Sequence, residues 1–260
     1  WSYNKKVPAS WQIKYKNLTF NIKPMGFKHT GLFPEQAVNW DWMINKIKSS
    51  GRKDVKVLNL FAYTGGATVA CSYAGASVCH VDSSKGMVAW AKENIASSGL
   101  SDRPGRFIID DVTKFVQREI RRGNKYDAII MDPPSYGRGA NGEVWQFENN
   151  IYDLVELCTK VLSDNPLFFL INSYTTGLSM TVLENVLSLT VNKKVSGHIS
   201  SDELGIKEEH SDLILPCGIY ARWEKEKYSD KICMKFGVEF GMQLHTMDLF
   251  ENDFKNYNDF

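Results

Sequence analysis

The sequence predicts an α/β protein built on a doubly wound, mostly parallel sheet. Residues 55–60 begin with alternating apolar and polar residues and continue as an apolar run. A polar turn with a glycine pair follows this run and leads into a helical segment. Further short apolar runs alternate with helical segments, as in successive β–α units. These further predicted strands are 77–81, 106–109, 126–131 and 166–171. Ligands of such sheets bind beyond the carboxyl ends of the strands, so the segments that follow each strand form the candidate site.

The composition fits one α/β domain with an appendage. The chain has 260 residues and is 43% hydrophobic. Its formal net charge of +1 is too small to indicate, by itself, a protein that binds a polyanion such as nucleic acid. Its five cysteines show no Cys-x-x-Cys spacing and no histidine pairing, so we expect no metal and a reducing compartment, the cytoplasm. Neither a signal peptide nor a membrane span is expected, and the oligomeric state stays open.

The N-terminal segment, residues 1–34, predicts a β-hairpin extension and the loop that leads into the main domain. Two short alternating runs, 12–15 and 18–23, flank a two-residue turn, and a helix is expected from residue 38 to Gly51. Six lysines and no acidic residue precede Glu35. These lysines are interpreted either as solvated strand edges or as a basic lip that meets nucleic acid.

The turn after the first central strand is the first candidate for a ligand site. A dinucleotide needs Gly-x-Gly-x-x-Gly at this place, whereas the loop offers only Gly65 and Gly66. Glycines lack a Cβ, so the backbone can come close to a ligand there. The more open loop favours S-adenosylmethionine over NAD, although a glycine pair at a strand end is often a simple turn.

Aspartates follow the next two predicted strands. Asp82 lies about 20 residues beyond the glycine loop, where a carboxylate binds ribose hydroxyls in nucleotide-binding α/β units. A helix N-cap is the alternative, because Ser83 and a helix come next. Asp111 is interpreted as the acceptor for an adenine amino group, with Asp110 as the alternative residue and helix capping as the alternative role.

The most specific motif follows the fourth central strand. It reads Asp132, Pro133, Pro134, Ser135 and Tyr136. Two prolines directly after a buried strand end the pairing and stiffen the backbone, so that the Asp132 carboxylate and the flanking carbonyls point into the cleft. Such acceptors suit an amino group on a planar base, on which Tyr136 can stack. A rigid turn with a packing tyrosine is the alternative interpretation.

The remaining elements complete the predicted sheet. Residues 147–163 and 179–189 read as helices on either side of the fifth strand, and a polar loop precedes the first of them. Residues 195–200 and 213–215 are expected as the closing antiparallel strands. No pattern assigns a role to the tail, residues 225–260.

The order of these motifs resembles class I S-adenosylmethionine-dependent methyltransferases, and more narrowly the large-subunit ribosomal RNA methyltransferase I-like group. The matching segments are Asn59 to Gly66, Asp82, Asp111, Asp132 to Tyr136, His29 to Gln36 and Leu215 to Trp223. The resemblance implies a Rossmann-like sheet of seven strands with the last strand antiparallel. It also implies a methyltransferase domain over residues 35–224, with RNA as the partner.

The same resemblance implies roles for individual residues. Those implied to bind S-adenosylmethionine are Gln36, Phe61, Tyr63, Thr64, Gly65, Gly66, Asp82, Ser83 and Asp111. Those implied on the methyl-acceptor side are Asp132, Pro133, Pro134 and Tyr136.

One departure from the resembling group bears on the chemistry. Members that make 5-methylcytosine carry a cysteine just after the fifth strand, because attack on a ring carbon needs a nucleophile. This sequence has Asn172, Ser173 and Tyr174 there. Cys217 is a poor substitute, since it lies near the end of the fold in an expected Pro-Cys-Gly turn. Methylation of a nitrogen is therefore favoured, because an amine needs only positioning and a proton acceptor.

The sequence thus predicts a methyltransferase that acts on a base nitrogen in RNA, with ribosomal RNA as the expected substrate. One alternative is a methyltransferase that acts on a protein side-chain amide or a small molecule, which the weak net charge favours and the acid-free N-terminal segment opposes. The other alternative is a nucleotide-binding or RNA-binding module without catalysis. A dehydrogenase is a distant third, because the glycine fingerprint is missing.

Overall fold

The computed structural model describes residues 4–26, 29–138 and 144–225. Up to Glu224 the described residues form one compact unit, the first of two into which the chain divides. Apart from Lys225, the tail of residues 225–260, for which the sequence predicts no role, lies outside the described residues.

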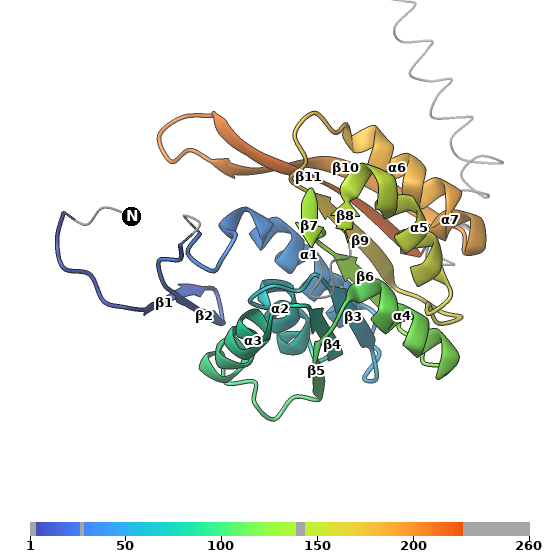
Figure 1. The fold of residues 1–260 in the computed structure, drawn as a ribbon, viewed down its shortest axis with the longest axis horizontal. Coiled ribbons are helices and arrows are strands. Elements are labelled where there is room, and N and C mark those ends of the chain that lie inside the picture. The colour runs from blue at the N-terminus through green and yellow to red at the C-terminus, as the bar shows by residue number, and fades with distance from the viewer. Residues whose placement is uncertain (1–3, 27–28, 139–143, 226–260) are drawn as a thin grey trace, which may run out of the picture. The chain divides into compact units, whose positions relative to one another are not determined.

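A seven-stranded sheet runs through the first unit in the order β10-β11-β9-β6-β3-β4-β5 (Figure 1). Its strands are β3 (Lys56–Leu60), β4 (Ser77–Asp82), β5 (Gly105–Ile109), β6 (Ala128–Met131), β9 (Phe168–Ser173), β10 (Gly197–Lys207) and β11 (Ile214–Lys225). Parallel pairs join β3 to β4, β4 to β5, β3 to β6 and β6 to β9, whereas β11 runs antiparallel to β9. The predicted α/β fold, with seven strands and an antiparallel last strand, is confirmed.

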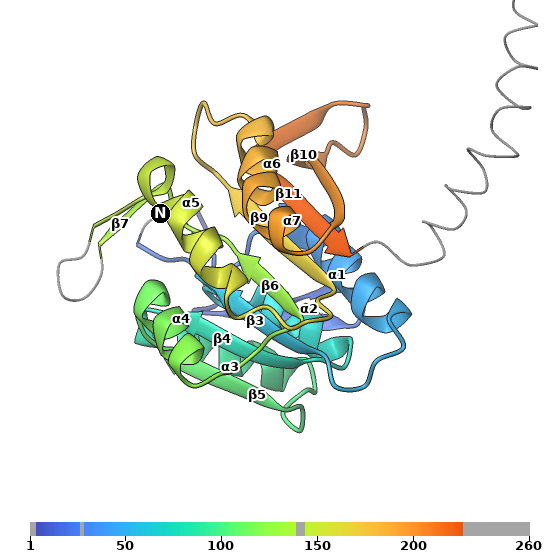
Figure 2. The same cartoon turned by 90° about the vertical axis from the view of Figure 1, so that its right-hand side faces the viewer.

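Helices cover both faces of this sheet (Figure 2). One face carries α1 (Ala37–Ser49), α2 (Gly66–Tyr73) and α3 (Lys85–Ser97). The other carries α4 (Val112–Arg121), α5 (Phe147–Thr159), α6 (Met180–Leu189) and α7 (Val191–Lys194). Alternate residues of β9 enter opposite cores, Phe168 with α1 and Phe169 with α5. Burial on both faces explains why the central strands appear in the sequence as unbroken apolar runs.

The predicted N-terminal hairpin is present as β1 (Trp11–Tyr15) and β2 (Leu18–Ile22). Hydrogen bonds of Asn21 hold it against α3, among them two of the Asn21 backbone. The Asn21 backbone N–H donates to Asn94 Oδ1 at 2.8 Å, and Trp90 Nε1 donates to the Asn21 carbonyl at 2.8 Å. This docking fixes the start of the segment that passes through Gly31 to the short 3-10 helix η1 (Pro34–Gln36) at the site.

The closing strands are longer than predicted. β10 has 11 residues and β11 has 12, and the expected Pro-Cys-Gly turn around Cys217 is wrong, because these residues lie inside β11. The pairing of β11 with β9 begins only at Ile219, so Pro216, which has no backbone N–H, removes no hydrogen bond from that ladder. Gly218 is packed so closely that a Cβ would stand 2.8 Å from the Ser173 carbonyl oxygen.

A two-stranded ribbon stands beside the sheet. It consists of β7 (Tyr136–Arg138) and β8 (Val144–Gln146), which pair antiparallel. The polar loop expected before α5 lies partly outside the described residues, and its described end belongs to β8. Among the residues that the structure describes, no helix has the length and apolarity needed to cross a membrane. No group of three or more potential metal-binding side chains occurs in the same part of the chain.

Candidate active site

The candidate site lies where β3, β4, β6 and β9 end. The parallel register aligns these four strand ends at one edge of the sheet. The polar or loop residues at that edge are Phe61, Asp82, Asp132 and Asn172. They come from distant parts of the chain and meet here because the carboxyl ends of parallel strands share an edge.

The glycine loop between β3 and α2 has an unusual backbone. Phe61 and Tyr63 have positive φ angles of 53° and 49°, which are rare for residues with side chains and cluster at ligand sites. Gly65 also has a positive φ, and a Cβ there would stand 2.9 Å from Ala91 Cβ. At Gly66 a Cβ would stand 2.9 Å from Cζ2 of Trp40. The loop therefore packs closely between two helices, and a larger residue at either glycine would displace them.

Asp82 holds this loop from the end of β4. Its Oδ2 accepts a hydrogen bond from the Tyr63 backbone N–H at 2.8 Å, and its Oδ1 accepts one from the Ser84 backbone N–H at 2.8 Å. Burial raises the pKa of Asp82, while the two backbone donors lower it. Ser84, not Asp82, is the N-cap of α3. Each Asp82 oxygen keeps lone-pair capacity for a further donor, such as a ribose hydroxyl.

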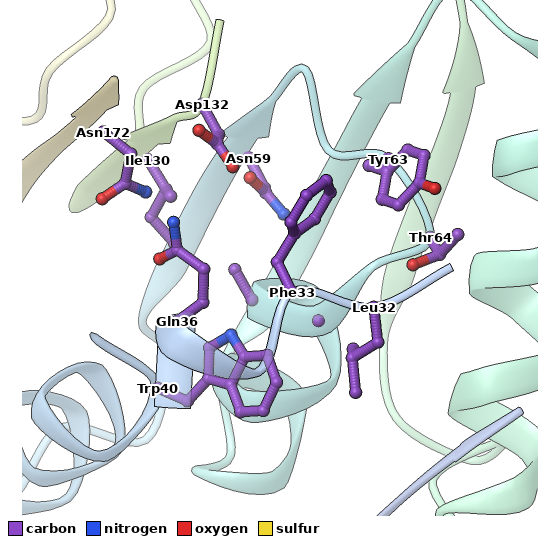
Figure 3. Close-up of a pocket in the computed structure, with 12 residues that line it drawn as sticks. Leu32, Phe33, Gln36, Trp40, Asn59, Tyr63, Thr64, Ile130, Asp132 and Asn172 are labelled. Carbon is purple, nitrogen blue, oxygen red and sulfur yellow. The ribbon is translucent and has the colours of Figure 1, made fainter. Parts of the chain in front are cut away.

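A hollow, partly open to solvent, lies beside this loop (Figure 3). Five of its lining residues were predicted as functional: on the cofactor side Gln36, Tyr63, Thr64 and Gly66, and on the acceptor side Asp132. The other lining residues are Leu32, Phe33, Trp40, Asn59, Ala67, Ile130 and Asn172. The hollow thus joins the first central strand, the fourth strand and the segment before α1, as one bound molecule would require.

Asp132 has no partner at one of its oxygens. Its Oδ1 is buried and makes no hydrogen bond within the described residues. Burial, with a smaller contribution from the charge of Glu35, raises the pKa of Asp132 to about 7. An unsatisfied buried carboxylate oxygen is costly, by about 1–3 kcal/mol, and such a cost is usual where a ligand completes the pairing. The Asp132 side chain points towards the hollow in Figure 3.

Aromatic side chains surround the other polar groups of the hollow. The ring of Phe33 lies with its centroid 5.5 Å from that of Tyr63 and 5.6 Å from that of Tyr174. Gln36 is buried, and its Nε2 donates to the Tyr174 hydroxyl at 2.9 Å. Thr64 is also buried, and its hydroxyl donates to the Gly31 carbonyl. This hydrogen bond ties the glycine loop to the segment that carries Phe33 and Gln36.

Asp111 and its neighbour Asp110 make different contacts from those of Asp82. Asp111 is the N-cap of α4, and its Oδ1 accepts from the Lys114 backbone N–H at 2.9 Å. Asp110, the alternative residue, forms an ion pair with Arg118. Asp111 lines a separate hollow with Trp145, on the side of α4 and α5. Its predicted contact with adenine therefore stays a prediction.

Phe61, Ser83, Pro133, Pro134 and Tyr136, which were also predicted, do not line the hollow. Phe61 packs against Trp145, with ring centroids 5.2 Å apart, and Ser83 is exposed. Pro133 is buried and Pro134 exposed, and the Pro134 carbonyl accepts from Trp145 Nε1 at 2.7 Å. Tyr136 is 52% exposed, so its ring is free to take a stacking partner.

Sequence reasoning missed several of the lining residues. Asn172 follows the apolar residues of β9 near the end of that strand, and this polar position at a strand end is the signal that could have identified it. Phe33 and Trp40 gave no such signal, because an aromatic residue at helical or loop spacing is usually part of a core.

The described cysteines offer no activated thiol. Cys71, Cys79 and Cys158 are buried, and burial raises the pKa of each thiol. Cys217 is partly buried, and desolvation together with the charge of Glu35 raises its pKa as well. Because the thiolate is the reactive form, a raised pKa makes a thiol a poor nucleophile at neutral pH.

Comparison with known proteins agrees with this geometry. The profile of the S-adenosylmethionine-dependent methyltransferase family matches residues 3–193. The ribosomal RNA large subunit methyltransferase K/L of Shewanella frigidimarina is 34% identical over 148 residues, which are 56% of this chain and 20% of that protein. The chain thus spans about a fifth of the curated relatives it matches.

Two solved structures show the same fold. An S-adenosylmethionine-dependent methyltransferase from Agrobacterium tumefaciens is 37% identical with a TM-score of 0.81, covering 86% of this chain and 72% of that one. A methyltransferase from Streptococcus mutans is 21% identical with a TM-score of 0.67, over 85% and 57% of the two chains, and supports the fold alone. The chain belongs to the S-adenosylmethionine-dependent methyltransferase family, and its cofactor is S-adenosylmethionine.

Proposed function

We propose that this chain transfers a methyl group from S-adenosylmethionine to a nitrogen of an RNA base, with large-subunit ribosomal RNA as the expected substrate. The observation that carries the proposal is the buried, unpaired Oδ1 of Asp132 at the end of β6. A hydrogen-bond acceptor without a partner suits an amino group that is about to be methylated. The curated relatives named as ribosomal RNA methyltransferases support RNA as the substrate class.

The residues around the hollow fit the cofactor. The Asp82 carboxylate, fixed by two backbone donors, suits the ribose hydroxyls, and the strained loop from Phe61 to Gly66 brings the backbone close to the ligand. In this proposal the second oxygen of Asp111 takes the adenine amino group, and Ser83 is a further contact of the adenosine. Gln36 contacts the amino-acid end of the cofactor in this arrangement.

The chain's own groups would position the acceptor. When bound, the cofactor supplies a methyl group on a positively charged sulfur. Asp132 and the Pro133 carbonyl hold the acceptor amine, Asp132 accepts the proton that the amine loses, and Pro134 keeps this segment stiff. Tyr136 stacks on the base after it leaves its helix. Catalysis then depends mainly on the geometry of approach.

The low nucleophilicity of the described thiols favours nitrogen over carbon as the methylated atom. Methylation of a pyrimidine ring carbon needs a covalent nucleophile, and the corresponding place near the end of β9 holds Asn172 in the pocket lining. Cys217, the least buried of the described cysteines, has a raised thiol pKa. A nitrogen acceptor needs no such group.

The test is transfer of a labelled methyl group to ribosomal RNA, followed by digestion to nucleosides. The expected product is a nucleoside methylated on a base nitrogen, formed by the wild type and not by Asp132→Asn. A label in a ring carbon would overturn the proposed chemistry. A label in protein or a small molecule, with none in RNA, would overturn the proposed substrate.

Salt dependence tests the RNA contact independently of catalysis. Lys14 is exposed on the N-terminal hairpin. Lys53 is exposed before the start of β3, at the edge of the sheet opposite the candidate site. If the hairpin meets phosphates, Lys14→Ala should reduce the slope of log affinity against log salt by about one, because one fewer counterion is released. The matched control Lys53→Ala should leave the slope unchanged, and an equal effect of both would place RNA elsewhere.

The same proposal fixes the organisation of the chain. Residues 35–224 would form the catalytic domain, and 1–34 the hairpin extension that meets RNA. The cytoplasm, where ribosomal RNA is available, is the location that goes with this substrate.

A further inference from the structure

A chain of buried polar side chains connects β11 to the hollow. Its members are Arg222 on β11, Asn39 on α1, Gln36 on η1 and Asn172 on β9, and each is at most 9% exposed. The guanidinium of Arg222 lies 4.7 Å from the ring centroid of Trp42 and 4.0 Å from that of Tyr220. The two rings hold the cation in place, and its N–H groups point towards Asn39.

The hydrogen bonds of this chain run in one direction. Arg222 Nε donates to Asn39 Oδ1 at 3.1 Å, and its Nη2 donates to the same oxygen. Asn39 Nδ2 donates to Gln36 Oε1 at 2.8 Å and to Asn172 Oδ1 at 2.9 Å. Each step passes from a donor to an acceptor, starting at the cation.

The chemistry of arginine fixes this direction. A side-chain amide can usually be turned over, because its oxygen and nitrogen are alike in shape. A guanidinium has donors only, so Asn39 must present its oxygen to Arg222 and its nitrogen to the other side. Gln36 and Asn172 must then use their oxygens for Asn39. One N–H of Gln36 donates to the Tyr174 hydroxyl, so the second N–H of Gln36 and the N–H groups of Asn172 are what remains for the hollow.

We propose that Arg222 is a positioning residue which, through Asn39, makes Gln36 and Asn172 a pair of N–H donors for the carboxylate of the cofactor's amino-acid end. This inference rests on the proposed cofactor site. Gln36 and Asn172 line the same side of the hollow, across from Tyr63 and Thr64 (Figure 3). Two fixed donors backed by a buried cation favour an anionic group over a neutral one.

Asn39→Asp reverses the direction of the chain without removing it. An aspartate can only accept, and it keeps its partner Arg222 as an ion pair. Gln36 and Asn172 must then turn their nitrogens towards residue 39, so their oxygens face the hollow. Oxygens in that place repel a carboxylate, whereas a ligand without a carboxylate is unaffected.

The measurement is calorimetric titration with two ligands, S-adenosylhomocysteine and 5′-methylthioadenosine. Both contain the adenosine and the sulfur, but only the first carries the carboxylate. Asn39→Asp should weaken S-adenosylhomocysteine at least about tenfold and change methylthioadenosine by less than about twofold. Equal loss of both ligands by a folded variant, or loss of neither, overturns the proposal.

If Asn39→Asp does not fold, a second pair of variants tests the positioning role of Arg222. Arg222→Lys keeps a donor-only cation, so the ratio of the two affinities should stay at the wild-type value. Arg222→Met frees Asn39 to turn over, and the ratio should shift against S-adenosylhomocysteine by several-fold. An unchanged ratio in Arg222→Met overturns the proposal.

Asp82→Ala separates this inference from the proposed cofactor site. Both ligands contain the ribose, so this variant should weaken both alike. If the wild type binds neither ligand, or Asp82→Ala changes neither affinity, the proposed cofactor site is wrong. If Asp82→Ala behaves as expected and the Asn39 and Arg222 variants do not shift the ratio, only the positioning role fails.

Discussion

Two carboxylates at the edge of the sheet, Asp82 and Asp132, differ in how completely the protein satisfies them. Both follow buried strands, and burial raises the pKa of both. Asp82 accepts hydrogen bonds from two backbone N–H groups. Asp132 has a buried oxygen that no described residue contacts with a hydrogen bond. Both oxygens of Asp82 therefore have a hydrogen-bond partner before any ligand binds, whereas one oxygen of Asp132 has none within the described residues.

This difference separates a preformed end of the site from an end that is completed by its ligand. Backbone donors cannot turn away, so Asp82 presents its remaining lone pairs in one fixed geometry. Asp132 keeps an unpaired oxygen at a cost to stability, and a ligand amine can remove that cost on binding. We therefore expect changes at Asp82 to affect cofactor affinity and changes at Asp132 to affect turnover.

Asp132→Asn should have the largest effect. An amide in place of the carboxylate cannot take the proton and presents donors to the acceptor amine, so kcat should fall about 10²- to 10³-fold. Affinity for S-adenosylhomocysteine should stay within about twofold of the wild type, because the change lies at the acceptor end. The measurements are methyl transfer under saturating cofactor and calorimetric titration.

The matched control is Asp164→Asn. Asp164 is exposed and precedes β9, at the amino edge of the sheet. It should keep full activity. A loss of cofactor affinity in Asp132→Asn as large as its loss in kcat would remove the distinction between the two ends.

Asp82→Ala should have the next largest effect, and on affinity. Loss of charged hydrogen bonds to the ribose, with two backbone donors left unpaired, should weaken S-adenosylhomocysteine about 10- to 100-fold. Asp82→Asn keeps one acceptor oxygen and should weaken it less. Titration of both variants gives the order, and an Asp82→Ala variant with wild-type affinity would place the ribose elsewhere.

The pH dependence sharpens the comparison at Asp132. Its pKa of about 7 means that kcat/KM should rise as pH increases through about 7, since the carboxylate form is the acceptor. Glu35→Gln removes a nearby negative charge, which lowers the pKa of Asp132, so the rising limb should move to lower pH. A limb that stays in place would show that another group titrates.

Stability gives an independent check on the same pKa. The carboxyl pKa is raised on folding, so the native state binds more protons than the unfolded state between pH about 4 and about 7. Stability should therefore decline as pH rises through this window. Asp132→Asn removes the titration, so its stability relative to the wild type should increase across the window and stay constant above it, as chemical unfolding would show.

The fold followed from the sequence because its signals are local. The strand before Gly65 and the strand before Asp132 are mostly apolar and buried on both faces, and a breaker follows each one. The exception was β11, where Pro216 and Gly218 indicated a turn. Whether a proline ends a strand depends on which neighbour its missing N–H faces, and that is a property of the sheet rather than of the segment.

The site was predictable only where a residue type carries its own chemistry. Carboxylates at strand ends could be found in order along the chain, although the sequence could not distinguish ribose binding from capping at Asp111. The link from Arg222 to Asn39 joins residues 183 positions apart. Nothing near either residue indicates the other, because the contact exists only after β11 pairs with β9 and α1 covers that face.

Cys217→Ser should have the smallest effect on activity. It tests whether a thiol takes part in methyl transfer, which the comparison of Asp82 with Asp132 does not address. If the acceptor end works through Asp132 on a nitrogen, the thiol takes no part, and kcat should stay within about twofold of the wild type. Cys217 is a sharp test because β11 runs antiparallel to β9, which places this cysteine towards the edge of the sheet where the site lies. A loss of activity comparable to that of Asp132→Asn, with a covalent RNA adduct trapped by the wild type, would mean that a ring carbon is methylated and that Asp132 serves a covalent mechanism instead.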